Sequence, residues 1–235
     1  MSFENVLVFG SKSPYKIPII NVTEIFSSNG SAELVNLYNR YNNKHSTMHS
    51  CVIGARSFLK LTEIKKRVIN SEPDTLIVRD HEDAQENIKK FFKNDLDICK
   101  FSKKKQFLFQ SKFFNKGIVD LMSAEASYQS SFKKKITHIF NGIFKYGFFG
   151  VSSGFFALLL AAKKYPNSNL IVSGLSFKGG THFYSKGEMT LNRGNVDKIL
   201  MNNLSEDIKK RIFIIDREVA TNFRLKEFKG KILNI

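Results

Sequence analysis

The chain has 235 residues, 42% of them hydrophobic, which is enough apolar material for a packed core and excludes a disordered protein. Its 37 Lys and Arg outnumber its 21 Asp and Glu. The resulting net charge of +16 favours anionic partners, namely nucleic acid, an anionic membrane, or phosphorylated and carboxylated substrates; a Lys-rich surface without such a partner is the plain alternative.

Two cysteines, Cys51 and Cys99, are too few for a disulfide framework or for a metal site built on cysteine. Cys51 lies within an apolar run, which predicts a buried free thiol. The N-terminus has no basic segment followed by an apolar one, and no run reaches the ~18 apolar residues of a membrane span. We therefore expect a cytoplasmic protein.

Short apolar runs that end at polar turns predict the strands of the N-terminal part. After the last of these runs, the sequence "HEDAQENIKKFFK" predicts a helix with acidic residues in its first turn. The expected strands are residues 5–9, ending at Gly10-Ser11, residues 33–37, leading to Asn39, residues 48–53, ending at Gly54, and residues 76–78.

The pattern changes between residues 100 and 135, where clusters of lysine alternate with phenylalanine. No linker rich in Gly or Pro marks a domain boundary. We therefore expect a single domain over residues 1–235, with a basic helical lid inserted at residues 100–135. A pair of amphipathic helices that covers the sheet is an equally good interpretation of the same residues.

The C-terminal part alternates helices with strands. Residues 155–162 are apolar on every side and predict a buried helix, and "NLIVSGLSF" predicts the next buried strand. The segments "GNVDKILMNNLSEDIKK", "RIFIID" and "EVATNF" continue the alternation. The sequence thus predicts an α/β fold, Rossmann-like, with a doubly wound and mostly parallel sheet. Ligands of such sheets lie at the carboxyl ends of the strands, where we expect Gly10, Ser11, Asn39, Gly54, Ser152, Ser153 and residues 174–182.

Residues 150–154, "GVSSG", match the G-x-S-x-G turn that presents the nucleophilic serine of an α/β-hydrolase. The triad of such an enzyme has a carboxylate and then a histidine after the serine. Only His182 follows Ser152, and no Asp or Glu lies between the two. A serine esterase that uses Ser152 is therefore the runner-up interpretation.

The alternative is that Ser152, Ser153 and Gly154 begin the buried helix. Hydroxyl and N–H groups at a helix N-terminus bind phosphate or carboxylate, helped by the positive end of the helix dipole. A serine that only caps the helix is the plain form of this interpretation.

The same triplet, the buried helix, "LIVSGLSF" and "KGGTHFY" resemble the C-terminal half of CMP-sialic acid-dependent sialyltransferases. In the eukaryotic enzymes a Ser-Thr-Gly-like triplet opens the small sialyl motif, and a His-Tyr-Tyr motif supplies the catalytic histidine; this chain has His182-Phe183-Tyr184. Bacterial lipooligosaccharide sialyltransferases have a similar Thr-Ser-Gly … Ser-Gly-x-x-Phe segment, matched by residues 152–154 and 173–177. "VLVFGSKSP" and "LVNLYNRYN" are similar to the first two strands of these families, so the resemblance covers residues 5–54 and 150–200.

The resemblance implies a GT-A-variant, sialyltransferase-like fold and an inverting transfer from a CMP donor. The donated sugar would be sialic acid, a related nonulosonate or Kdo, and the acceptor a hydroxyl of lipooligosaccharide or capsule. No metal or cofactor is expected, because a CMP donor carries one phosphate. The implied roles are His182 as general base, Lys178, Tyr184 and Arg193 at the departing phosphate, and Gly10, Ser11, Asn39, Ser152, Ser153 and Gly154 as nucleotide and carboxylate contacts.

The chain departs from these families at two places. Its first turn reads Gly10-Ser11 where they have Gly-Asn. In the bacterial enzymes the base precedes a Lys-Asn-Thr-Asp-like stretch, and the nearest match here has no histidine but contains Asn192 and Asn195. The eukaryotic pattern, with His182 as the base, is therefore the one that the resemblance implies.

The positive charge and the Lys/Phe-rich lid would also attract an anionic membrane, so we expect a cytoplasmic protein peripheral to the inner membrane. The interleaved Lys and Phe of residues 101–114 suit base stacking and phosphate contacts as well. A non-enzymatic nucleic-acid-binding protein is the second alternative, although the chain has no RRM, KH or helix-turn-helix signature.

Overall fold

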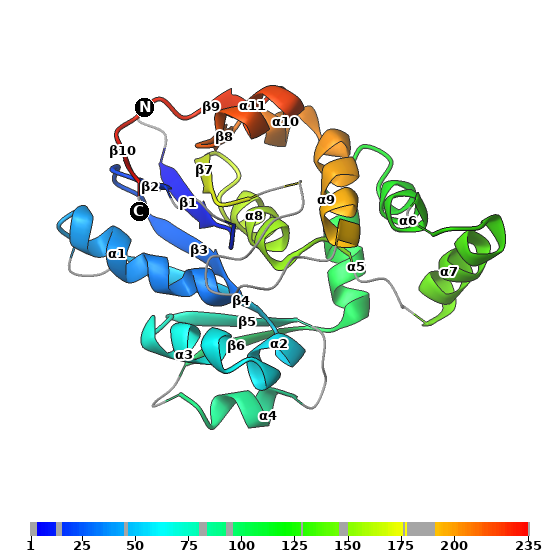
Figure 1. Ribbon diagram of the computed structural model, residues 1–235, viewed down its shortest axis with the longest axis horizontal. Helices are drawn as coiled ribbons and strands as arrows, with labels where there is room; N and C mark the ends of the chain where they lie inside the picture. The colour runs from blue at the N-terminus through cyan, green and yellow to red at the C-terminus, as the bar shows by residue number, and fades with distance from the viewer. Residues whose placement is uncertain are drawn as a thin grey trace.

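The centre of the protein is a parallel sheet of eight strands (Figure 1). The structure is a computed structural model that describes residues 4–12, 16–44, 47–79, 84–92, 96–127, 129–145, 150–175, 177 and 191–234. The predicted α/β fold with a mostly parallel sheet is confirmed. Across the sheet the strands are β6 (Asp97–Phe101), β5 (Thr75–Arg79), β4 (Met48–Gly54), β3 (Glu24–Ser28), β1 (Asn5–Phe9), β7 (Asn169–Ser173), β8 (Ile212–Ile214) and β9 (Lys226–Glu227).

Helices cover both faces of the sheet, as a parallel sheet requires, because its strands are apolar on both sides. Within β1, residues 6–9 are fully buried. One face packs against η1 (Asn29–Glu33), α1 (Leu34–Tyr41), α2 (Ala55–Lys60), α3 (Thr62–Asn70) and α4 (Ala84–Lys89). The other packs against α5 (Lys103–Ser111), α6 (Ile118–Ser127), α8 (Ser153–Lys164), α9 (Leu191–Asn203), α10 (Glu206–Lys209) and α11 (Arg217–Phe223).

Two further elements lie outside these layers. An antiparallel ribbon of β2 (Lys16–Pro18) and β10 (Ile232–Asn234) packs Ile17 on the α1 side of the sheet. Helix α7 (Phe132–Lys145) projects from the body beside α6 (Figure 1). No helix in the described part of the chain has the length and apolar character needed to cross a membrane.

The predicted strand at residues 33–37 is wrong, because this segment ends η1 and begins α1. Leu34, Val35 and Tyr38 are buried, and their spacing is that of one helix face rather than of a strand. The strand of this region lies earlier, at Glu24–Ser28, where the run is short and half polar.

Other expectations are confirmed. The helix predicted over residues 155–162 is the middle of α8, and the predicted strands at residues 5–9, 48–53 and 76–78 lie within β1, β4 and β5. Cys51 is buried and free, and burial raises the pKa of its thiol to about 12. Residues 100–135 are largely helical, but they begin in β6, a strand that the lysines of this region concealed.

Candidate functional site

The order of the strands reverses at the boundary between β1 and β7. From β1 the chain builds the sheet outward through β3 to β6, then returns to the centre as β7 and builds outward the other way. Crevices at the carboxyl ends of strands at such a reversal are the usual ligand sites of doubly wound folds. The turns after β1 and β7 therefore lie where a ligand site is expected in this fold.

These two turns are in direct backbone contact. The N–H of Gly10 donates to the carbonyl of Ser173 at 2.8 Å, and the N–H of Lys12 donates to the carbonyl of Gly174 at 3.0 Å. A Cβ on Gly10 would lie 2.2 Å from the carbonyl oxygen of Gly174, and Gly174 has a φ of 71°. Glycine is needed at both positions, at Gly10 for space and at Gly174 for conformation.

Serine side chains join the end of β1 to the end of β3. The hydroxyl of Ser11 donates to the carbonyl of Ser28 at 2.9 Å, and the hydroxyl of Ser31 donates to the carbonyl of Phe9 at the same distance. All three serines are buried. Ser11 thus fixes the geometry of the turn after β1.

The N-terminus of α8 packs against these two turns. Ser152 caps the helix by accepting the N–H of Phe155 at 3.3 Å, and Ser153 is 8% exposed. A Cβ on Gly154 would lie 3.4 Å from the Cα of Gly10 and 3.5 Å from the hydroxyl of Ser28. Because the N–H of Phe155 is bound by this cap, an anion at this helix end would contact the N–H groups of Ser153 and Gly154.

Buried polar side chains hold the loop that leads into α8. Gly150 has a φ of 63°, and its N–H donates to the carboxylate of Glu125. The next two N–H groups are also bound by side chains: that of Val151 donates to Gln110 at 3.0 Å, and that of Ser152 to Asp197 at 2.9 Å. These three side chains and Arg79 come from different elements of the fold, and we call them the loop cradle. Its members are Arg79 of β5, Gln110 of α5, Glu125 of α6 and Asp197 of α9.

Arg79 is the cation of the cradle and is only 1% exposed. Its guanidinium donates to the carbonyl of Val151 and to the side chain of Gln106, both at 2.8 Å, and its Nη1 lies 3.5 Å from the hydroxyl of Ser153. It also lies 4.5 Å above the ring of Phe156. A charge buried at this depth is stable only when its hydrogen-bond donors are satisfied. The loop carbonyl therefore stabilises the Arg79 guanidinium, and the guanidinium in turn holds the loop in place.

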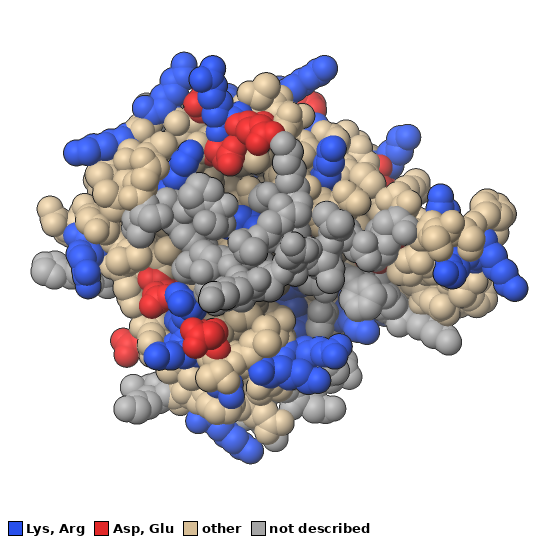
Figure 2. Space-filling view, viewed as in Figure 1, with Lys and Arg blue, Asp and Glu red and all other residues tan. Residues whose placement is uncertain are grey.

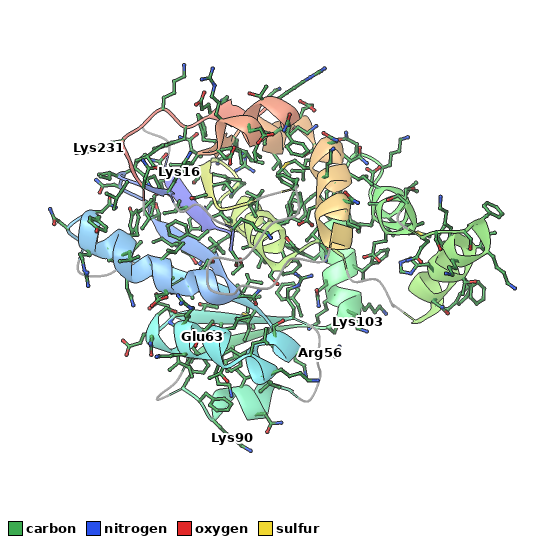
Figure 3. The ribbon with its side chains drawn as sticks, viewed as in Figure 1. Lys16, Arg56, Glu63, Lys90, Lys103 and Lys231 are labelled. Carbon is green, nitrogen blue, oxygen red and sulfur yellow. The ribbon has the colours of Figure 1, made fainter. Side chains whose placement is uncertain are left out.

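Further cations lie at the same edge of the sheet. Lys12 follows β1, is 6% exposed, and has its pKa lowered by burial. Arg56 and Lys103 lie at the starts of α2 and α5, directly after the carboxyl ends of β4 and β6, and both are exposed (Figure 3). Together these groups make this edge attractive to an anionic ligand.

The structure brings together most of the described residues that the sequence predicted for the site. Gly10, Ser11, Ser152, Ser153 and Gly154 meet as described above. The expectation for Asn39 is wrong: it lies near the end of α1, at the opposite edge of the sheet, where it accepts a hydrogen bond from Thr47 at 2.8 Å. Its predicted position depended on the strand at residues 33–37, which does not exist. Lys178, His182 and Tyr184 lie outside the described residues, as does the side chain of Arg193 at the start of α9.

Sequence analysis missed Lys12 and the loop cradle. Lys12 had a visible signal, because it directly follows Gly10-Ser11 at the end of the first strand. The members of the cradle stand far apart in the sequence, and nothing in their local context distinguishes them from surface residues. Only the fold shows that they share one loop.

The geometry bears on both alternative functions. Ser152 has a φ of −59° and makes the hydrogen bond of an ordinary helix cap, whereas a nucleophilic serine of the G-x-S-x-G type sits on a strained turn. Phe107, Phe113 and Phe114 are buried in the core, and Phe109 packs against Phe156. These rings are not available to stack on the bases of a nucleic acid.

In the described part of the chain, His, Cys, Asp and Glu do not form a group of three or more that could hold a metal ion. The carboxylates of Glu125 and Asp197 are bound to N–H groups of the loop, and the hydroxyls, N–H groups and cations near these turns suit an anionic ligand rather than a cation. Comparison of the chain with protein-family models, with curated proteins and with solved structures found no match.

Proposed function

We propose that the protein is an inverting glycosyltransferase that moves sialic acid, or a related nonulosonate or Kdo, from its CMP donor to a hydroxyl of a lipooligosaccharide or capsule acceptor. One observation carries the proposal: the turns after β1 and β7 and the N-terminus of α8 meet at the reversal point of the sheet. This is the position at which doubly wound folds bind nucleotides.

The residues at the carboxyl end of the sheet support an anionic donor. A CMP-linked acid sugar carries a phosphate and a carboxylate, and the first turn of α8, Ser153 and Lys12 all lie at this end. The loop cradle supports the same conclusion, because side chains from distant parts of the chain hold one short loop in place. Such support is typical of loops whose atoms contact a ligand.

The identity of the donor rests on the sequence. Ser152-Ser153-Gly154 and Ser173-Gly174 occupy this crevice and are the residues in which the chain resembles sialyltransferases. By the same resemblance we assign His182 as the general base and Lys178, Tyr184 and Arg193 as stabilisers of the departing phosphate. The fold variant is then the GT-A-like one of these enzymes, and residues 100–135 lie on the acceptor side.

The proposed reaction balances without a metal or redox partner. The acceptor oxygen attacks the anomeric carbon of the sugar as the bond from that carbon to the phosphate oxygen breaks. CMP leaves with the bonding electron pair, and His182 takes the proton of the acceptor hydroxyl. Cations and helix N–H groups stabilise the negative charge that develops on the phosphate.

Differential scanning fluorimetry with CMP, UDP and GDP tests the proposal. We expect CMP to raise the melting temperature selectively, and Ser152→Ala to reduce this shift. Ser102→Ala is the matched control, since Ser102 caps α5 in the same way by accepting the N–H of Lys105 at 3.3 Å. No shift with any nucleotide, or equal shifts with all three, would overturn the proposal. Labelling of Ser152 by a fluorophosphonate would favour the esterase instead.

A further inference from the structure

Helix α7 exposes a continuous apolar stripe. Phe132, Ile136, Phe140 and Phe144 are 78%, 52%, 58% and 65% exposed. They follow one another at intervals of four residues, so they lie along one side of the helix. The rings of Phe140 and Phe144 contact each other, with centroids 4.3 Å apart. We call these four side chains the α7 stripe.

The opposite side of α7 holds it against the protein. Nε2 of His138 lies 3.0 Å from Oε2 of Glu125, a buried carboxylate of α6, and Gly142 is buried as well. An amphipathic helix of a globular protein normally turns its apolar side to the core and its polar side to water. In α7, by contrast, Phe132, Phe140 and Phe144 face outward, while His138 faces the body.

The charge of α7 indicates what covers the stripe. Lys133 and Lys134 are exposed beside it, Lys135 is half-buried, and the helix sequence "FKKKITHIFNGIFK" contains no Asp or Glu. The far end of the molecule formed by α7 shows Lys side chains next to uncharged atoms (Figure 2). Lysines beside aromatic and aliphatic side chains on one short helix match an anionic lipid surface.

The dimensions of α7 fit a helix that lies on a membrane. Its 14 residues correspond to about 21 Å, too short to cross a hydrocarbon core of about 30 Å. A helix that projects from the body, as α7 does in Figure 1, can lie flat on a surface while the rest of the protein stays in water.

We propose that α7 docks the protein on an anionic lipid bilayer, with the α7 stripe inserted at the boundary between headgroups and acyl chains and its lysines on the anionic headgroups. This inference does not depend on the proposed reaction. Of the Lys/Phe-rich residues 100–135, from which a membrane contact is expected, it keeps only the last four, which begin α7, since the phenylalanines at residues 107, 113 and 114 are buried.

A single-tryptophan reporter gives a direct test, because the chain contains no Trp. Phe140→Trp places the fluorophore in the stripe, and Leu61→Trp, at a position that is 51% exposed on the body, is the matched control. With vesicles of phosphatidylcholine and phosphatidylglycerol we expect a blue shift of the emission from Phe140→Trp and none from Leu61→Trp. Vesicles of phosphatidylcholine alone should give a much smaller shift.

Vesicle flotation of the otherwise unchanged chain provides the second measurement. We expect Phe140→Ser with Phe144→Ser to weaken binding to the mixed vesicles more than tenfold, and Lys133→Glu with Lys134→Glu to weaken it similarly. Both pairs are exposed, so the thermal transition in circular dichroism should stay the same. Failure of the unmodified protein to float, or equal blue shifts from both reporters, would overturn the proposal. So would a blue shift without vesicles that grows with protein concentration, since a second copy would then cover the stripe.

Discussion

Gly10 and Gly174 lie so close together that the turn after β1 and the turn after β7 form one unit. The Cβ that any other residue would place on Gly10 falls 2.2 Å from the carbonyl oxygen of Gly174 and 2.6 Å from its carbonyl carbon. Both atoms belong to the backbone, so no side-chain rotation can relieve the contact. The close approach of the two turns therefore depends on two glycines that are far apart in the sequence.

Gly10→Ala should lower the free energy of unfolding by at least about 2 kcal/mol, because the two turns must separate to admit a methyl group. Gly54→Ala is the matched control, since Gly54 also ends a strand but a Cβ there meets only the Ser57 side chain, at 3.6 Å from its hydroxyl and 3.9 Å from its Cβ. We expect Gly54→Ala to change stability by less than about 1 kcal/mol. Urea unfolding of the two variants measures the difference, and equal losses would contradict the role of the contact.

Asp197→Ala should weaken both folding and nucleotide binding, because it leaves the partly buried N–H of Ser152 without its acceptor. A lost hydrogen bond of this kind typically costs about 1–3 kcal/mol. Asp197→Asn keeps an acceptor oxygen at the same position and should lose less in urea unfolding and in CMP titration calorimetry. If both variants bind CMP as the unmodified protein does, the loop cradle does not serve the site.

The free energy of unfolding should decrease as the pH is lowered, because His49 is buried. Burial lowers the pKa of His49 to about 4, and its Nε2 lies 2.7 Å from the hydroxyl of Ser27. The unfolded chain, with a histidine pKa of about 6.5, takes up the proton first, so the stability provided by neutral His49 is complete above pH 6.5 and is lost as the pH falls to about 4. Between pH 7 and pH 5 we expect a loss of about 2 kcal/mol from this group. His49→Gln should remove that part of the pH dependence in urea unfolding.

His182→Ala should abolish most transfer from CMP-sialic acid while leaving the CMP-induced shift in melting temperature unchanged. The proposed base contacts the acceptor hydroxyl rather than the nucleotide, and removal of a general base typically costs about 10²–10⁴-fold in rate. An endpoint transfer assay would detect this loss. Full activity of His182→Ala, together with a large gain from Asn192→His or Asn195→His, would place the base in the bacterial position instead.

The central strands could be predicted because they are buried on both faces. Runs such as "VLVF" and "LIV" are apolar at every position, and this pattern distinguishes them from half-exposed elements. β3 escaped prediction because "EIFSS" ends in hydroxyls that the fold uses to bind the carbonyl of Phe9 and the side chain of His49. Its polar atoms are satisfied only by residues that are distant in the sequence.

The sequence predicts the glycines and serines of the candidate site but not the side chains of the loop cradle that hold them in place. Gly10, Ser152 and Gly154 stand at turns, where local sequence is informative. Gln110, with 1% exposure, looks like a surface residue within a lysine-rich helix. Its role appears only when α5 lies against the loop at Gly150. Asn39 was misplaced because the apolar residues before it were interpreted with the two-residue period of a strand, whereas they follow the period of a helix.

The order of the strands has a consequence for the nascent chain. Asn5 and Asn169, which are paired in the sheet, stand 164 positions apart. During synthesis the strands from β1 to β6 can assemble first, and until β7 emerges the free edge of β1 is unpaired and apolar over residues 6–9. A prematurely terminated chain therefore exposes an aggregation-prone edge where the finished protein has its crevice. The last large step of folding both protects that edge and creates the site.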